Sequence, residues 1–444
     1  MAHWLNTGVG KGHAHVLALH TFALLFVLIA FSPPSIGGGA FAADGDTTSC
    51  PDGNAGLTLP KGFCATIFAD HVGAPRHMAV GADGTLYVNN RSRTRSASGS
   101  LLALKDSKGD GHADINQTFG PPNSGGTGIA IYKNWLFVDI GDRIIRYTLA
   151  PGDIAPKGEP ETVVSNIPID GDHTPRPFAI DPQGNLFVDL GSATNSCQRD
   201  NRADQSPGVD PCVELKTRAG IWSFDANKTG QVFSAAERFA TGLRNAEGID
   251  FDDAGRIFAT QHGRDQLYEN WPNLYSSGQG SELPAEVMVE LHQGGDYGWP
   301  YCYFDGYQQK LVLAPEYSGD GGKSVGRCGD KRPPVAAFPG HWAPNDLKIY
   351  KGTQFPESYR GGAFIAFHGS WNRSSGAQEG YNVVFQPLAD GKASGPYIVF
   401  ADGFRNGDGT GTEHRPTGLA VGPDGALYVA DDAAGRIWRI VFKG

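Results

Sequence analysis

Several short segments of this chain place arginine, histidine and tryptophan side chains beside the ends of expected strands. A histidine can take a proton from a substrate hydroxyl near neutral pH. Converging guanidinium groups need an anionic partner, and their planar forks match carboxylates. A tryptophan face beside them suits a flat, conjugated ligand. The residues concerned are His173, Arg176, Arg244, Asn245, 261–265, His368, Trp371, Asn372, Arg373, His414 and Arg415.

Each of these segments also has a plain structural interpretation when it is taken alone. A single histidine before a strand is usually a turn residue or a satisfied surface residue, and an Arg-Asn pair can cap loop carbonyls. The aromatic segment at 294–303 can be a rigid corner. The functional interpretation therefore depends on these segments meeting at one place in the fold.

A short phrase recurs along the chain: a turn ending in glycine, then an alternating apolar strand. It reads VGADGTLYV at 80–88, IDPQGNLFV at 180–188, FDDAGRIFA at 251–259 and VGPDGALYV at 421–429, with looser versions at 132–140 and 359–367. The glycine supplies a positive φ, and the alternation places one face in a core. One hairpin cannot bury its own face, so a ring of repeats must do so. The six copies predict an all-β, six-bladed β-propeller over residues 43–444, with functional residues on the loops at one end of its channel.

The bulk composition fits such a fold. The chain has 444 residues, of which 62 are glycine and 29 are proline, and 40% of it is hydrophobic, which is far too apolar for a disordered chain. Its formal net charge is −10. This acidic balance argues against nucleic acid and against anionic lipid surfaces as partners.

The N-terminus has the pattern of a signal peptide. Lys11 precedes an apolar run at 22–31, and Ala40-Phe41-Ala42 forms an A-x-A cleavage pattern. Residues 1–42 are therefore expected to be removed, which leaves a periplasmic or secreted protein without stable membrane insertion. The alternative is an uncleaved anchor, although the apolar run is shorter than the roughly 20 residues that a spanning helix needs.

Six cysteines follow the expected cleavage point: Cys50, Cys64, Cys197, Cys212, Cys302 and Cys328. An even number in an exported chain indicates disulfides. Pairing of sequence neighbours (50–64, 197–212 and 302–328) is the simplest connectivity.

An acidic turn at 105–114 partly resembles a calcium loop. Asp106, Asp110 and Asp114 fall at positions one, five and nine of an EF-hand count, but Lys108 and Gln117 stand where ligands belong. A solvated acidic turn is the plainer interpretation.

The segments GLRNAEGIDFDDAGRIFATQHG, GGDYGWPYCY, FIAFHGSWNR and RPTGLAVGPDGALYVADD resemble the glucose/sorbosone dehydrogenase family, in particular its L-sorbosone and aldose sugar dehydrogenase branch. The resemblance covers essentially the whole chain after residue 42. It implies a six-bladed propeller that binds pyrroloquinoline quinone (PQQ) with calcium and oxidises sugars.

Carried over by position, the resemblance implies specific roles. His173 takes the place of the catalytic histidine, and Arg244 with Asn245 matches the pair at the quinone. Gly263 and Arg264 stand where backbone carbonyls hold the calcium. Trp371, Arg373 and Arg415 match positions at the cofactor plane and its carboxylates. The chain departs from the glucose-specific pattern in having Gly263-Arg264 for Gly-Pro, Arg373 for lysine and Arg415 for a pair of arginines.

The expected function is oxidation of a sugar or sugar aldehyde of the aldose or sorbosone type with PQQ and Ca²⁺. The electrons are expected to pass to a separate cytochrome or quinone. Two alternatives stay open. One is a propeller without cofactor that binds carbohydrate or a partner, and the other is a lactonase-type hydrolase with a central calcium.

Overall fold

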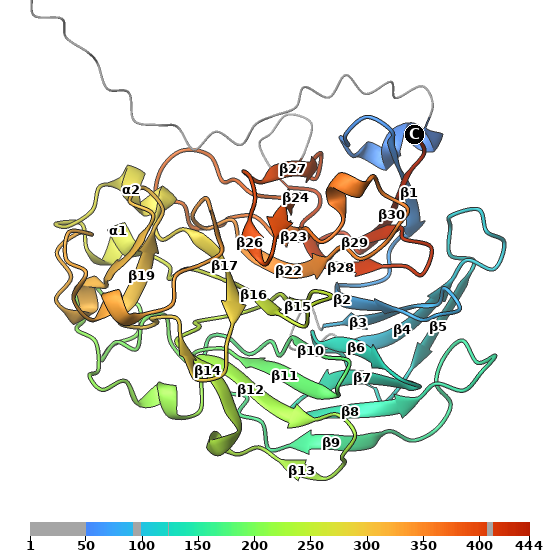
Figure 1. The fold of residues 1–444 in the computed structure, drawn as a ribbon, viewed down its shortest axis with the longest axis horizontal. Coiled ribbons are helices and arrows are strands. Elements are labelled where there is room, and N and C mark those ends of the chain that lie inside the picture. The colour runs from blue at the N-terminus through green and yellow to red at the C-terminus, as the bar shows by residue number, and fades with distance from the viewer. Residues whose placement is uncertain (1–49, 92–98, 123, 406–411) are drawn as a thin grey trace, which may run out of the picture. The chain divides into compact units, whose positions relative to one another are not determined.

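The computed structural model describes residues 50–91, 99–122, 124–405 and 412–444. The predicted signal peptide lies outside these residues. The described chain forms six sheets arranged as the blades of a β-propeller. In Figure 1 the innermost strands of the six blades surround a common centre. The predicted fold class is therefore confirmed.

The blades follow one another along the chain. Blade 1 contains β2 (Pro75–Val80), β3 (Leu86–Asn90), β4 (Ser100–Lys105) and β5 (Ile115–Phe119). Blade 2 contains β6 (Ile129–Tyr132), β7 (Trp135–Ile140), β8 (Arg143–Thr148), β9 (Glu161–Ser165) and the edge strand β13 (Gln231–Val232). Blade 3 contains β10 (Phe178–Ile180), β11 (Asn185–Leu190), β12 (Gly220–Asp225), β14 (Arg238–Thr241) and the edge strand β18 (Gly295–Asp296).

Blade 4 contains β15 (Ile249–Phe251), β16 (Ile257–Gln261), β17 (Glu286–Leu291) and β21 (Ala336–Phe338). Blade 5 contains β22 (Pro344–Ile349), β23 (Ala363–Phe367), β24 (Asn382–Gln386) and β27 (Ile398–Ala401). Blade 6 contains β28 (Pro416–Val421), β29 (Leu427–Asp431), β30 (Arg436–Phe442) and β1 (Phe63–Ala69). Because β1 pairs antiparallel with β30, the two ends of the described chain close the ring in one sheet.

Shorter elements lie in the connections between these strands. The helices are α1 (Leu267–Asn270) and α2 (Ser277–Glu282), with 3-10 turns η2 (Pro51–Gly56), η3 (Val213–Lys216), η4 (Ala235–Glu237), η5 (Pro315–Tyr317), η6 (Gly326–Asp330) and η7 (Glu357–Tyr359). Two small hairpins pair β19 (Cys302–Asp305) with β20 (Lys310–Leu313) and β25 (Leu388–Ala389) with β26 (Lys392–Ala393). Among the described residues, no helix combines the length and apolar character needed to cross a bilayer.

The recurring phrase marks the turn between the first and second strands of a blade. The N–H of Gly84 donates to the Gly81 carbonyl at 2.9 Å, and the N–H of Gly184 donates to the Asp181 carbonyl at 3.0 Å. Both glycines have positive φ, +82° and +90°, which side chains with a Cβ rarely adopt. Side chains along the second strand point alternately to its two faces, so one face packs against each of the two neighbouring blades.

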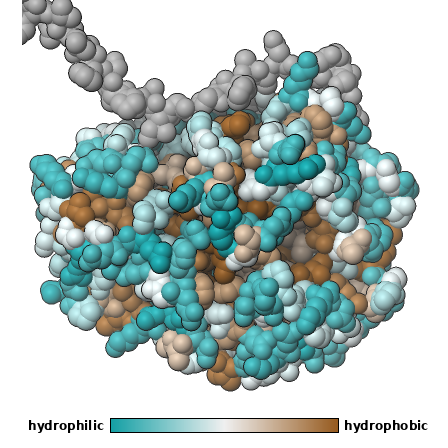
Figure 2. All heavy atoms as spheres, in the orientation of Figure 1, coloured by the Kyte–Doolittle hydropathy of each residue, from teal (hydrophilic) through white to brown (hydrophobic). Residues whose placement is uncertain are grey.

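Six hydrophobic clusters fill the spaces between neighbouring blades. Met78 of blade 1 and Tyr428 of blade 6 share one cluster, and Leu101 of blade 1 and Leu136 of blade 2 share the next. The innermost strands β2, β6, β10, β15, β22 and β28 contact one another in a ring. Most of the face seen in Figure 2 is hydrophilic, and apolar residues show near its centre. The propeller therefore has six interblade cores and an axial channel.

All six cysteines form disulfides: Cys50–Cys64, Cys197–Cys212 and Cys302–Cys328. This is the predicted pairing of neighbours. The acidic turn between β4 and β5 uses its carboxylates internally. Asp106 accepts N–H groups of Gly109 and Gly111 at 2.6 and 2.7 Å, and Asp114 accepts the N–H of Ser107 at 2.7 Å.

Candidate functional site

A cavity of about 210 Å³ lies at the end of the channel where the innermost strands begin. Its walls come from loops that precede β10, β15 and β22, from loops that follow β11, β16 and β23, and from the first residue of β17. The lining residues are His173, Arg202, Arg244, His262, Gly263, Asp265, Glu286, His341, Ala343, Trp371 and Asn372. The cavity thus combines imidazoles, guanidinium groups, carboxyl groups and one indole ring.

Arg244 is almost entirely committed to the protein. Its Nε donates to the backbone carbonyl oxygen of Asn195 at 3.1 Å, and its Nη2 donates to Oδ1 of the same residue at 2.9 Å. Nη1 donates to the Gly263 carbonyl at 2.9 Å, and Nη2 also donates to Asp265 at 2.8 Å. A guanidinium carries five N–H donors. These four bonds leave one N–H of Arg244 without a partner among the described residues, and the side chain borders the cavity.

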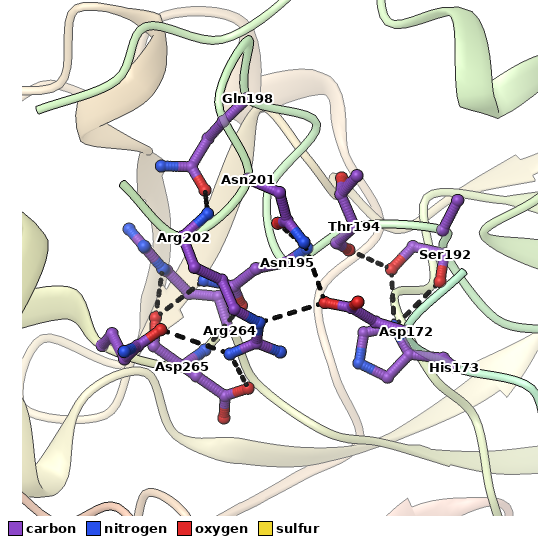
Figure 3. Close-up of polar contacts among 12 residues, drawn as sticks. Asp172, His173, Ser192, Thr194, Asn195, Gln198, Asn201, Arg202, Arg264 and Asp265 are labelled. Carbon is purple, nitrogen blue, oxygen red and sulfur yellow. Dashed lines mark hydrogen bonds and ion pairs between the residues drawn. The ribbon is translucent and has the colours of Figure 1, made fainter. Parts of the chain in front are cut away.

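Asp265 joins the two arginines of the cavity. Its Oδ2 accepts from Arg244 and, at 2.9 Å, from Arg202, while its Oδ1 accepts from Asn372 at 2.8 Å. Arg202 also donates to Asp172 at 3.0 Å, and its guanidinium therefore lies between the carboxylates of Asp172 and Asp265 (Figure 3). Burial alone raises the pKa of Asp265, but the charges of Arg244 and Arg202 outweigh it and hold the pKa below its usual range. Asp265 is therefore anionic and fixes both arginines.

Arg202 reaches the cavity from a loop that is closed at its base. The loop runs between Cys197 and Cys212, which form a disulfide. Asn270 of α1 donates to the Arg202 carbonyl at 3.1 Å and ties the loop to the neighbouring blade. A cross-link and a partly buried hydrogen bond limit the positions open to this loop.

His173 is held through one ring nitrogen. Nδ1 lies 2.9 Å from the Ser192 carbonyl oxygen and 2.9 Å from its Oγ, while that hydroxyl donates to the Thr194 carbonyl at 2.6 Å (Figure 3). A carbonyl oxygen only accepts, so Nδ1 carries the hydrogen and Nε2 keeps a free lone pair. Burial, together with the charge of Arg244, lowers the pKa of His173 well below its ordinary value. His173 is therefore a neutral base at pH 7.

The remaining titratable groups of the cavity are also buried. Nε2 of His262 lies 3.1 Å from the Pro344 carbonyl oxygen, and burial lowers the pKa of this histidine to about 4. Burial likewise lowers the pKa of His341. Glu286 accepts the N–H of Gly263 at 2.9 Å, yet burial raises its pKa to about 8. The lining groups that are charged near neutrality are then two arginines and one aspartate, and Arg202 is also paired with Asp172 outside the lining. The unused N–H of Arg244 is the donor that remains for an anionic ligand.

Of the eight residues to which the resemblance assigns roles, four line this cavity: His173, Arg244, Gly263 and Trp371. Trp371 is 64% exposed and presents a free indole face. The other four are not part of the lining. Asn245 donates to Glu247 at 3.3 Å, and Arg264 is buried in an ion pair with Glu316 at 2.7 Å. Arg373 pairs with Glu282 at 2.6 Å, and Arg415 donates to the carbonyls of His368 and Gly369 at 3.0 and 2.6 Å.

Comparison with known proteins agrees with this architecture. The model of the TrAA12-like family matches residues 57–443. The chain belongs to the TrAA12-like family. Across 394 residues it is 26% identical to an uncharacterized protein of Borreliella burgdorferi, with 87% of this chain and 91% of that protein covered.

A curated relative of this TrAA12-like chain has a named activity. It is the pyrroloquinoline quinone-dependent pyranose dehydrogenase of Coprinopsis cinerea, 28% identical over 52% of this chain and 36% of that protein. The matched stretch is thus about a third of the relative's length. The holo form of its PQQ domain has the same fold, with a TM-score of 0.69 at 21% identity over 87% of this chain and 97% of that structure.

The structure of the TrAA12-like chain adds site residues that the sequence did not single out. Asp172, directly before His173, is one of them, whereas His262, Asp265 and Asn372 are among the candidates that the sequence does single out. Arg202 sits in a disulfide loop whose position the sequence leaves open. Glu286 and His341 carry no recognisable motif, because each reaches the cavity only through the packing of blades 4 and 5.

Proposed function

We propose that this protein is a PQQ- and calcium-dependent dehydrogenase that oxidises a pyranose or a related aldose or sorbosone-type sugar. One observation carries the proposal: a neutral His173 with a free Nε2 shares a cavity with an arginine that has one N–H to spare. The named relative is a PQQ-dependent pyranose dehydrogenase, which supports the same chemistry here.

The cavity residues fit a flat quinone that bears carboxylates. Trp371 offers an exposed aromatic face, and the two guanidinium groups share the Asp265 carboxylate, while Arg202 is also paired with Asp172. The buried Oδ1 of Asn245 has no partner among the described residues, so it is available to a ligand donor. Bound PQQ would supply an electrophilic quinone carbonyl as the hydride acceptor.

The protein's own groups then divide the remaining work. His173 takes the proton of the sugar hydroxyl at Nε2, while the Ser192 carbonyl holds the ring through Nδ1. The unused N–H of Arg244 would donate to the quinone oxygen of bound PQQ, where negative charge would develop. Asp265 holds Arg244 in place, because its Oδ2 accepts a hydrogen bond from Nη2 of Arg244 at 2.8 Å. Trp371 and Asn372 form the exposed side, where the sugar enters.

Calcium would be held by backbone carbonyls at Gly263 and Arg264. The Gly263 oxygen accepts from Arg244, and a carbonyl oxygen has a second lone pair for a hard cation. Two arginines nearby oppose a lone Ca²⁺, so we expect the ion to bind together with the cofactor carboxylates. Titration of Ca²⁺ by calorimetry should be silent without PQQ and give heat with it. Tight Ca²⁺ binding to the protein alone would contradict this order.

The finer features of the proposal concern the surroundings of the reaction. The protein is exported and processed after residue 42, and its electrons leave to a separate cytochrome or quinone. These two features are supported by the N-terminal pattern and by the family resemblance, respectively.

A dye-reduction assay tests the function. Purified protein is mixed with PQQ, Ca²⁺ and an artificial electron acceptor, and reduction is followed across a panel of aldoses, sorbosone and polyols. We expect PQQ-dependent reduction with at least one aldose or aldehyde sugar. Sugar binding without any reduction would favour the carbohydrate-binding alternative, which the engagement of Arg264, Arg373 and Arg415 in the scaffold would then explain.

A further inference from the structure

A network of buried polar and charged side chains starts at Asn245 and crosses the channel. The Nδ2 of Asn245 donates to Oε1 of Glu247 at 3.3 Å, and Oε2 of Glu247 pairs with Arg76 at 3.1 Å. Arg76 pairs in turn with Asp432 at 3.0 Å, and Asp432 accepts from His368 at 2.8 Å. All of these links join groups with little access to water.

This network of side chains joins four of the six blades. Glu247 precedes β15 of blade 4, and Arg76 lies in β2 of blade 1. Asp432 follows β29 of blade 6, and His368 follows β23 of blade 5. Removing one partner of such a buried set leaves an uncompensated charge, so each member holds its neighbours in place.

The network fixes the orientation of the Asn245 amide. Burial alone raises the pKa of Glu247, but the charge of Arg76 outweighs the effect of burial and lowers the pKa. Glu247 is therefore an ionised carboxylate, whose oxygens accept hydrogen bonds and donate none. The Nδ2 group must therefore face Glu247, and Oδ1 faces the other way. That oxygen is buried and has no partner among the described residues. A Cβ placed on Gly191 would lie 3.1 Å from it and 2.6 Å from the Cβ of His173.

We propose that Glu247, held by Arg76, is a positioning residue that fixes the Asn245 amide with Oδ1 on the side of His173. The site then accepts a hydrogen bond there from an N–H or O–H of the bound cofactor or sugar. This inference rests on the proposed function for the identity of the ligand. Leaving such a buried acceptor unpaired costs free energy, so a ligand donor at this point adds affinity and selects orientation.

The test compares variants by PQQ affinity and thermal midpoint. Glu247→Gln and Asn245→Ala should each raise the dissociation constant of PQQ about tenfold, the effect of one buried hydrogen bond. In the double variant the two effects should not add, because Glu247 acts through Asn245. Asp346→Asn is the matched control. Asp346 is a fully buried channel carboxylate that accepts the N–H of Leu419 at 2.8 Å, so its loss should lower the thermal midpoint and leave PQQ affinity unchanged.

A merely structural role for Glu247 gives a different result. In that case Glu247→Gln lowers the thermal midpoint like Asp346→Asn but leaves PQQ affinity unchanged, or its effect adds fully to that of Asn245→Ala. Either outcome overturns the inference. If the wild type takes up no PQQ, the proposed function fails, and an atomic-resolution crystal structure of the unliganded protein still decides the orientation. Nδ2 on Glu247 supports the positioning role, and Oδ1 on Glu247 contradicts it.

Discussion

His173 and Ser192 form the contact that sets the chemistry of the cavity. The Nδ1 of His173 lies 2.9 Å from the Ser192 carbonyl oxygen, an atom that can only accept. The proton of the neutral ring is therefore on Nδ1, and Nε2 is the basic atom. The partner at Nδ1 is a neutral carbonyl and not a carboxylate, and the effect of the nearby Asp265 charge, which favours protonation of the ring, is outweighed by burial and by Arg244.

Replacement of His173 tests this assignment. His173→Ala should reduce turnover by roughly 100-fold or more, the usual contribution of a positioned base, while PQQ affinity stays near that of the wild type. Steady-state dye reduction and a PQQ titration measure the two quantities. His292→Ala, at a histidine 41% exposed in its side chain, is the control and should match the wild type. Near-normal turnover of His173→Ala with every active sugar would make the base assignment wrong.

The pH dependence of the reaction follows from the same residue. Its pKa is lowered below 6.5 by burial and then by Arg244, so His173 stays neutral until the pH falls below the ordinary range of histidine. The acid limb of kcat/KM should therefore have its midpoint below pH 6.5, and activity should not fall between pH 8 and 6.5. A midpoint above pH 7 would show that His173 is not the group that limits the reaction, or that its surroundings differ.

Arg244 should be sensitive even to a conservative change. Lysine keeps the positive charge but cannot reproduce four bonds from one planar fork. Arg244→Lys should therefore weaken PQQ binding and reduce turnover, each by at least about tenfold. Arg436→Lys, at a half-buried pair with Asp70 on the outer part of blade 6, is the matched control for loss of an arginine fork. Equal behaviour of the two variants would remove Arg244 from the site chemistry.

The sequence predicted the ring well because its signals are local. The glycine of each phrase closes a turn between two adjacent strands, and neighbouring cysteines pair across short loops. Four residues predicted from the sequence, His173, Arg244, Gly263 and Trp371, also line one cavity in the structure. Position at a blade end does not give the direction of a side chain, however. Arg264 turns inward because Glu316 lies opposite it, and Glu316 reaches that place only through a loop far along the chain.

A buried acid away from the cavity should be visible in the stability of the protein. Asp139 of β7 accepts the N–H of Thr127 at 2.7 Å, and burial raises its pKa to about 6 from 3.8. The folded state thus holds this proton more tightly than the unfolded state, so Asp139 makes the free energy of unfolding fall as pH rises from about 4 to 6. The full effect is at most roughly 3 kcal/mol for a shift of this size.

The Asp139→Asn variant isolates that contribution. Asparagine keeps an acceptor for Thr127 and removes the charge, so the variant should gain stability over the wild type as pH rises from 4 to 6, and the gain should level off above 7. Chemical denaturation at a series of pH values measures the difference. A difference that is constant across this range would mean that Asp139 does not titrate with a raised pKa.

The central claim is that this cavity binds PQQ and passes hydride to it from a sugar with His173 as the base. The most direct measurement is a single-turnover experiment on protein loaded with PQQ and Ca²⁺, in which an active sugar is added without an electron acceptor and the cofactor spectrum is followed. The account predicts rapid reduction of the bound cofactor, one sugar oxidised per cofactor, and a rate about 100-fold lower in His173→Ala with the cofactor still bound. A protein that does not retain PQQ, or whose bound PQQ is unchanged by every sugar, would contradict the account.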